Sequence, residues 1–242
     1  MSGHSKWKNI MHRKEKTDAQ RAKVFTKIGK EMSIAVKDGG ANPASNSKLK
    51  DLIAKAKSFN VPNDNIERII KKASSDDSDK YENITYEGYG PNGVAVIVEC
   101  ATDNRNRTSG DLRHYFDKFG GNLGATGCVT YLFDRKGIIV IDAGKIDEDK
   151  LMDDVLEAGA ADFVEEDEVF QVFTDPALVS EVSGELEKRG YSFLSAEAEM
   201  LPSMYVTLDD EESVAKMNRL LDHLEDNDDV INVWHNWEND DR

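Results

Sequence analysis

The stretch from Gly137 to Ala196 decides the fold, and it reads GIIVIDAGKIDEDKLMDDVLEAGAADFVEEDEVFQVFTDPALVSEVSGELEKRGYSFLSA. Short apolar runs alternate in it with segments of helical periodicity. The pattern predicts strand, helix, strand, strand, helix and strand at residues 137–141, 147–158, 161–164, 169–173, 176–189 and 192–196. This βαββαβ order is the split-βαβ, ferredoxin-like pattern.

The two flanks of this stretch each predict one further βαβ unit. The first has strands at 94–100 and 128–133 around a helix at 105–119, and the second has strands at 204–208 and 230–234 around a helix at 211–224. The flanks make a second ferredoxin-like unit if they meet in space. Two consecutive units, residues 94–166 and 168–235, fit the same pattern. Periodicity alone leaves the nested and the consecutive arrangements open.

Residues 17–73 predict three amphipathic helices. Thr17 or Asp18 can cap the first helix, which runs to Lys37, and Pro43 and Pro62 lie at the starts of the other two. On a helical wheel, the first helix has one apolar face and one basic face. The apolar face holds Ala22, Phe25, Ile28, Met32, Ala35 and Val36, and the basic face holds Lys23, Lys27, Lys30 and Lys37. A polar linker at residues 74–79 then marks a domain boundary.

Charge is distributed very unevenly along the chain. Residues 1–75 hold 17 Lys and Arg against 7 Asp and Glu, which gives +10. Residues 76–242 hold 14 against 40, which gives −26 and the total of −16. A basic head on an acidic body indicates a polyanionic partner for the head, because the body repels nucleic acid except at local basic spots.

The candidate nucleic-acid contacts follow from this charge pattern. We predict phosphate contacts from the head and base contacts or packing from Trp7 and His12. The phosphate-contacting set is Lys6, Lys8, Arg13, Lys14, Lys16, Arg21, Lys23 and Lys27. Arg105 and Arg107 lie between a predicted strand and the helix that follows it, and they are a candidate second contact with nucleic acid. Salt bridges to surrounding acids are the alternative interpretation of these two arginines.

Signals for catalysis, cofactors and metals are weak, so we expect a non-enzymatic protein without a cofactor. The glycine-rich stretch at residues 121–127 follows a helix and precedes a strand, the reverse of a dinucleotide fingerprint. The five histidines lack metal-ligand spacing. Cys100 and Cys128 lie in apolar runs and are expected to be reduced and buried. The chain has neither a long apolar run nor a secretory signal, which predicts a cytoplasmic protein without a membrane partner.

Several motifs in this chain resemble one known family. They are SGHSKW at residues 2–7, HRK at 12–14, FTK at 25–27, NDNI at 63–66, YEGYGP at 86–91, TDNRNRT at 102–108 and GNLG at 121–124. In this order they resemble the YebC/PmpR family, which includes mitochondrial translational activators of cytochrome c oxidase. Asn9-Ile10-Met11 departs from the family's more frequent Ile-Lys-His, and one basic contact is missing there. The start of the chain resembles that of a bacterial member.

The resemblance implies an α+β fold with a three-helix domain followed by two ferredoxin-like α/β domains, one inserted in the other. The expected boundaries are 1–78 for the basic helical domain, 79–134 plus 203–242 for a discontinuous α/β domain, and 135–202 for the inserted α/β domain. The family is described both as DNA-binding transcriptional regulators and as ribosome-associated translation factors that act on proline-rich stretches.

Between these two activities, the residues favour RNA. A duplex-DNA reader needs a recognition helix that reaches base edges, and no helix-turn-helix signal is present. Aromatic and histidine side chains interleaved with basic ones suit unstacked or structured RNA. We therefore expect an rRNA- or ribosome-bound monomer, with DNA-binding transcriptional regulation as the alternative. A protein adaptor that works through the acidic α/β domains is the third hypothesis.

Overall fold

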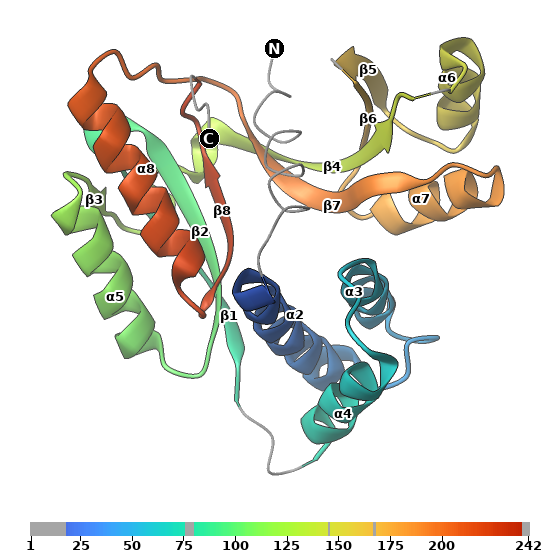
Figure 1. The fold of residues 1–242 in the computed structure, drawn as a ribbon, viewed down its shortest axis with the longest axis horizontal. Coiled ribbons are helices and arrows are strands. Elements are labelled where there is room, and N and C mark those ends of the chain that lie inside the picture. Colours follow the sequence, from blue (N-terminus) through green and yellow to red (C-terminus); the bar gives the residue numbers. More distant parts are fainter. Residues whose placement is uncertain (1–17, 76–79, 145, 167, 239–242) are drawn as a thin grey trace. The chain divides into compact units, whose positions relative to one another are not determined.

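The computed structural model describes residues 18–75, 80–144, 146–166 and 168–238. This part of the chain is mixed α+β, with seven α-helices and two four-stranded antiparallel sheets (Figure 1). It forms two compact units. One is Leu132–Met204, and the other comprises the described residues on either side of that segment.

The Leu132–Met204 unit confirms the βαββαβ prediction. Its elements are β4 (Phe133–Asp142), α6 (Glu148–Glu157), β5 (Asp162–Glu166), β6 (Val169–Thr174), α7 (Val179–Lys188) and β7 (Phe193–Pro202). The strand order β5-β6-β4-β7 places the first and third strands of the pattern in the centre of the sheet. The core of this unit joins Ile139 and Ile141 of β4 to Leu151 of α6 and Leu186 of α7.

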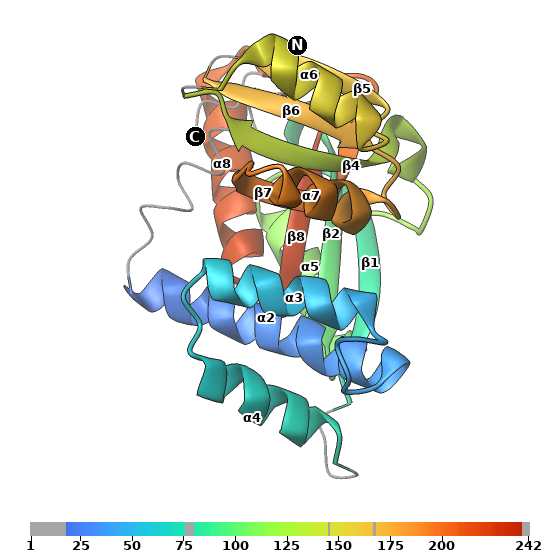
Figure 2. The same ribbon diagram turned by 90° about the vertical axis from the view of Figure 1, so that its right-hand side faces the viewer.

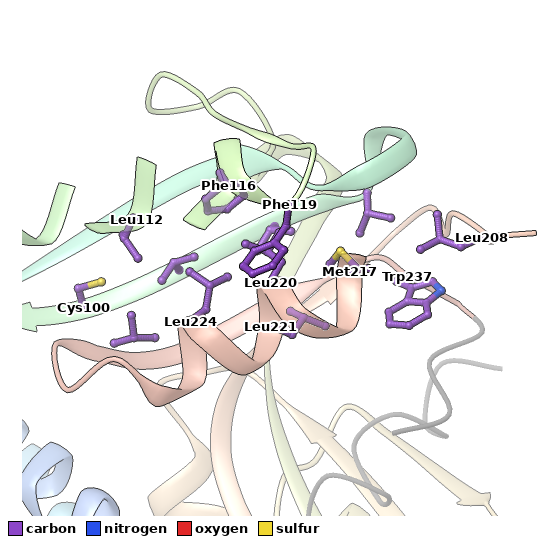
Figure 3. Packing of buried hydrophobic residues seen from close by; sticks show 14 residues of the cluster. Cys100, Leu112, Phe116, Phe119, Leu208, Met217, Leu220, Leu221, Leu224 and Trp237 are labelled. Carbon is purple, nitrogen blue, oxygen red and sulfur yellow. The ribbon is translucent and has the colours of Figure 1, made fainter. Parts of the chain in front are cut away.

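The sheet of the other unit is built from both flanks of the insertion. Its elements are β1 (Glu82–Tyr89), β2 (Ala95–Thr102), α5 (Arg105–Lys118), β3 (Asn122–Leu123), α8 (Glu211–Asp226) and β8 (Val230–His235), in the strand order β3-β1-β2-β8. Because β8 pairs with β2, the flanks do meet in space, and the nested arrangement is confirmed. Helices α5 and α8 place Leu112, Phe116, Leu220 and Leu224 in one core over this sheet (Figure 3).

Three local predictions for this sheet were wrong. Strand β1 was missed, because its alternating side chains are half-exposed and include polar residues. The strand expected at 128–133 is a turn and a 3₁₀ helix (Thr130–Leu132), after which β4 begins at Phe133. The strand expected at 204–208 is reduced to a single bridge between Val206 and Trp237. Cys128 is only half-buried, whereas Cys100 is fully buried, and both thiols are free.

The glycine-rich stretch after α5 lies directly against β1. A Cβ on Gly121 would lie 2.3 Å from the carbonyl oxygen of Tyr89, and one on Gly88 would lie 2.6 Å from the carbonyl oxygen of Asn122. Two backbones therefore approach more closely here than side chains permit. This close approach explains why glycine occurs at these positions, and a phosphate-binding role is not needed to explain it.

The helices α2 (Asp18–Gly39), α3 (Ser47–Ser58) and α4 (Asn63–Ala73) correspond to the three predicted helices. The predicted start of the second helix at Pro43 was wrong, because Pro43 lies in a turn and α3 begins at Ser47. The side chain of Asn46 caps α3 by accepting a hydrogen bond from the amide of Leu49. Helix α2 packs against both α3 and α4, which have little contact with each other (Figure 2). Met32 of α2, Leu49 of α3 and Ile66 of α4 meet in their common core. The three-domain boundaries given above stay a prediction.

Candidate nucleic-acid interface

The predicted contact residues fall into two groups. Lys6, Trp7, Lys8, His12, Arg13, Lys14 and Lys16 lie outside the described residues, as does the side chain of Arg21. Lys23, Lys27, Arg105 and Arg107 are described. Of these four, Lys23, Lys27 and Arg107 gather near the C-terminal end of α8, whereas Arg105 pairs with β1.

Two lysines of α2 are bound to the end of α8. The ammonium group of Lys23 donates to the carboxylate of Asp226 at 2.8 Å, and that of Lys27 donates to the backbone carbonyl of Glu225 at 2.6 Å. The last carbonyls of a helix have no partner within it, and the helix dipole makes this end partly negative. These two lysines of the basic face are therefore satisfied by the protein's own acidic helix end.

Asp229, just before β8, is the centre of this contact. Its Oδ1 accepts from the ammonium of Lys30 at 2.6 Å, and its Oδ2 accepts from Arg107 at 2.7 Å and from the hydroxyl of Thr108 at 2.9 Å. Burial alone would raise the pKa of this carboxyl group. The hydrogen bonds from Lys30, Arg107 and Thr108 outweigh burial and lower the pKa to about 2. An ionised carboxylate thus ties α2, α5 and β8 together.

An open cavity of about 410 Å³ lies beside this cluster. Its lining residues are Lys30, Tyr81, Asp103, Arg107, Asp111, Asp226, Asn227, Asp228 and Asp229. Arg107 pairs with Asp103 as well as with Asp229, and these hydrogen bonds raise the pKa of its guanidinium group. A phosphate in this cavity would face five carboxylates and two cations that already have partners, so the cavity is poorly suited to an anion.

Arg105 forms a separate pair. Its guanidinium group donates two hydrogen bonds of 2.6 Å to the carboxylate of Glu82 on β1. The salt bridges of the alternative interpretation are thus present for both arginines. Contact with nucleic acid stays a prediction for Arg105 and Arg107, and it requires exchange of these acidic partners.

The sequence analysis missed what covers the basic face of α2. Ile34 lies on that face, four residues after Lys30 and seven after Lys27, and it is buried, with 5% of its surface exposed. Lys30 itself is only 8% exposed. An isoleucine inside a lysine face is the signal that could have indicated a covering surface, because a solvated basic face has no reason to carry it.

The outermost pair of this contact should contribute little to stability. The side chains of Lys23 and Asp226 are 39% and 76% exposed, so water screens their attraction. We expect Asp226→Ala to lower the free energy of unfolding by less than about 1 kcal/mol, as measured by urea denaturation. A loss above about 2 kcal/mol would show that the end of α8 depends on this pair.

Neither a metal site nor a membrane span is found in the described ranges. No group of three or more His, Cys, Asp or Glu side chains among those residues could hold a metal ion. None of the helices described is long and apolar enough to cross a membrane.

Fold and charge together define a basic three-helix region followed by two acidic α/β units, one inserted in the other. The chain belongs to the TACO1/YebC family: residues 5–76 match the model of the TACO1/YebC protein N-terminal domain, and residues 81–237 match that of the TACO1/YebC second and third domain. The resemblance inferred from the motifs is thereby confirmed.

Similar proteins support this assignment over the whole length of the chain. A protein of Acetivibrio thermocellus called "Probable transcriptional regulatory protein" is 59% identical, covering 98% of this chain and 99% of its own. One of Ruminiclostridium cellulolyticum with the same name is 58% identical, covering 99% and 98%. The crystal structure of a conserved hypothetical protein, Aq1575 from Aquifex aeolicus, is 45% identical, has a TM-score of 0.83 and covers 92% of each chain.

Proposed function

We propose that this chain is a non-enzymatic, nucleic-acid-binding regulator of gene expression, and that its partner is ribosomal RNA in the cytoplasm. One observation carries the proposal, namely the division of charge between +10 in residues 1–75 and −26 in residues 76–242. Such a chain attracts a polyanion to one end and repels it from the rest. The ribosome offers a dense phosphate surface, and assistance with proline-rich stretches is the translational role we favour.

The packing of α2 supports RNA over duplex DNA. A helix that reads the major groove must present an open face to base edges. In α2, one face packs against α3 and α4, and the other holds Lys23 and Lys27 against the end of α8. Trp7 and His12, interleaved with basic residues, suit stacking on unpaired bases.

Transcriptional regulation through DNA is the second candidate. The names of the relatives from Acetivibrio thermocellus and Ruminiclostridium cellulolyticum favour it. It relies on the same basic head, so the choice between the two candidates depends on which nucleic acid the chain accompanies in the cell.

Sedimentation of lysate through sucrose gradients at low and high salt, with RNase and DNase controls, tests this choice. We expect the chain to travel with ribosomes or the large subunit at low salt and to leave them at high salt or after RNase treatment. Sedimentation that is sensitive to DNase and absent from ribosomal fractions would support transcriptional regulation instead.

The head itself can be tested by replacing Arg13, Lys14 and Lys16 together with Ala. Each lost phosphate contact should lower the magnitude of the slope of log K against log salt by roughly one. We therefore expect the slope of the triple variant to be smaller in magnitude by about three. Fluorescence anisotropy with a labelled RNA hairpin measures this slope. Unchanged affinity and slope would remove these residues from the proposed interface.

A further inference from the structure

The helical region has an inner helix and two outer ones. Helix α2 is the inner helix, because it packs against α3 and α4 with Met32 and contacts β2 and β8 on its other side. Ile34 and Lys30, both buried, lie on that other side. Exposed residues of this region consequently belong to a large extent to α3 and α4.

The outer helices are strongly basic. Their basic residues are Lys48, Lys50, Lys55, Lys57, Arg68, Lys71 and Lys72, against the acids Asp51, Asp64 and Glu67, a net charge of +4. Basic residues also lie in the last turn of both helices, where their positive charge interacts favourably with the negative end of the helix dipole. The dipole accounts for the terminal lysines but not for Lys48 and Lys50 in the first turn of α3, where a positive charge is unfavourable.

The ammonium groups of four of these lysines have no partner in the described part of the chain. Lys48, Lys50, Lys57 and Lys71 are exposed, and none of their ammonium groups makes a hydrogen bond or ion pair with another described residue. Lys50 and Lys57 are two helical turns apart, so they lie on one side of α3 about 10 Å from each other along its axis. This contrasts with Lys23 and Lys27, whose ammonium groups are already bound to the end of α8.

We propose that α3 and α4 form the phosphate-binding surface of the helical region, with Lys48, Lys50, Lys57 and Lys71 contacting the RNA backbone. Lys23 and Lys27 instead hold α2 against α8. This inference rests on the proposed function, because it locates the surface on which the RNA lies. An ammonium group without a partner can neutralise a phosphate directly, whereas Lys23 and Lys27 must first give up an acid or a carbonyl.

Two variants with the same change of charge test the inference in the full chain. The first carries Lys50→Ala and Lys57→Ala, and the second carries Lys23→Ala and Lys27→Ala. Binding to a labelled RNA hairpin and to a DNA duplex is measured over a range of salt, with circular dichroism as the control for folding. For the first variant we expect RNA binding roughly 20- to 60-fold weaker at ~0.1 M salt and a slope lower by about two. The second variant should keep the slope of the unmodified chain.

The outcomes separate the surface from the function. An unchanged slope in the Lys50/Lys57 variant, or a slope lowered only in the Lys23/Lys27 variant, overturns the α3–α4 surface while the proposed function stands. A Lys50/Lys57 variant that loses DNA binding but keeps RNA binding overturns RNA as the partner of this surface. If the unmodified chain shows no salt-sensitive RNA binding, the proposed function fails and this surface fails with it.

Discussion

Asp229→Ala is expected to lower the free energy of unfolding by about 3–5 kcal/mol, which is the cost of leaving a buried charge without its partner. The side chains of Asp229 and Lys30 are only 6% and 10% exposed, so water cannot replace the missing carboxylate. Arg107 and Thr108 lose an acceptor at the same time. Urea denaturation followed by the fluorescence of Trp234 and Trp237, in and beside β8, measures the loss.

The neighbouring Asp228 provides a matched control. Asp228→Ala removes the same charge from an exposed position and leaves the backbone carbonyl that accepts from Lys30 in place. We expect a change within about 0.5 kcal/mol. Adding Lys30→Met to Asp229→Ala should recover part of the stability, because it removes the stranded ammonium group. A loss below about 1 kcal/mol for Asp229→Ala would contradict a buried, coupled pair.

The same carboxylate makes stability depend on acid pH. Its pKa falls from an ordinary value of 3.8 to about 2 in the folded chain, so the folded state favours the ionised form. The stability that it contributes is complete above the unfolded value and is lost as pH falls through the folded value. Between about pH 4 and pH 2, the difference in unfolding free energy between the unmodified chain and Asp229→Ala should therefore narrow.

Local patterns were sufficient for most of the fold. The helices and the βαββαβ unit follow from periodicity, since each buries an apolar face at its own repeat. Strand β1 does not follow from periodicity, because its side chains are partly exposed and partly buried and because it includes Gly88, which packs against the backbone of Asn122. The pairing of β8 with β2 joins residues more than a hundred positions apart, and no local pattern specifies it. Only the family resemblance selected it.

Local sequence patterns specify even less of the candidate site. On a helical wheel, the lysines of α2 suit a phosphate surface and an acidic partner within the chain equally well. Lys30 and Asp229 are 199 residues apart, so nothing in the periodicity of either segment connects them. The buried Ile34 was the one local indication, and it identifies a covered face without identifying what covers it.

Glu87→Ala should be comparably destabilising, at about 3–5 kcal/mol, because three backbone amides, one of them buried and two partly buried, lose a charged acceptor together. Oε1 of Glu87 accepts from the amide of Gly127 at 2.7 Å, and Oε2 accepts from those of Val129 and Thr130 at 2.9 Å each. Burial alone would raise the pKa of Glu87, but these backbone hydrogen bonds outweigh it and lower the pKa. Its contribution is therefore lost as pH falls through the folded pKa.

Glu87→Gln separates the contribution of the carboxylate as a hydrogen-bond acceptor from that of the shape of the side chain. Glutamine keeps the shape, but it has one carbonyl oxygen, and its NH₂ group must face a backbone N–H donor. We expect it to restore little stability and to speed hydrogen exchange at Gly127, Val129 and Thr130, the amides that the carboxylate holds. Glu82→Gln, on the same strand, is the control, because the side chain of Glu82 is half-exposed and, among the described residues, its carboxylate bonds only to the side chain of Arg105. Slow exchange at all three amides in Glu87→Gln would mean that the loop after β3 is fixed by its glycine contacts with β1 instead.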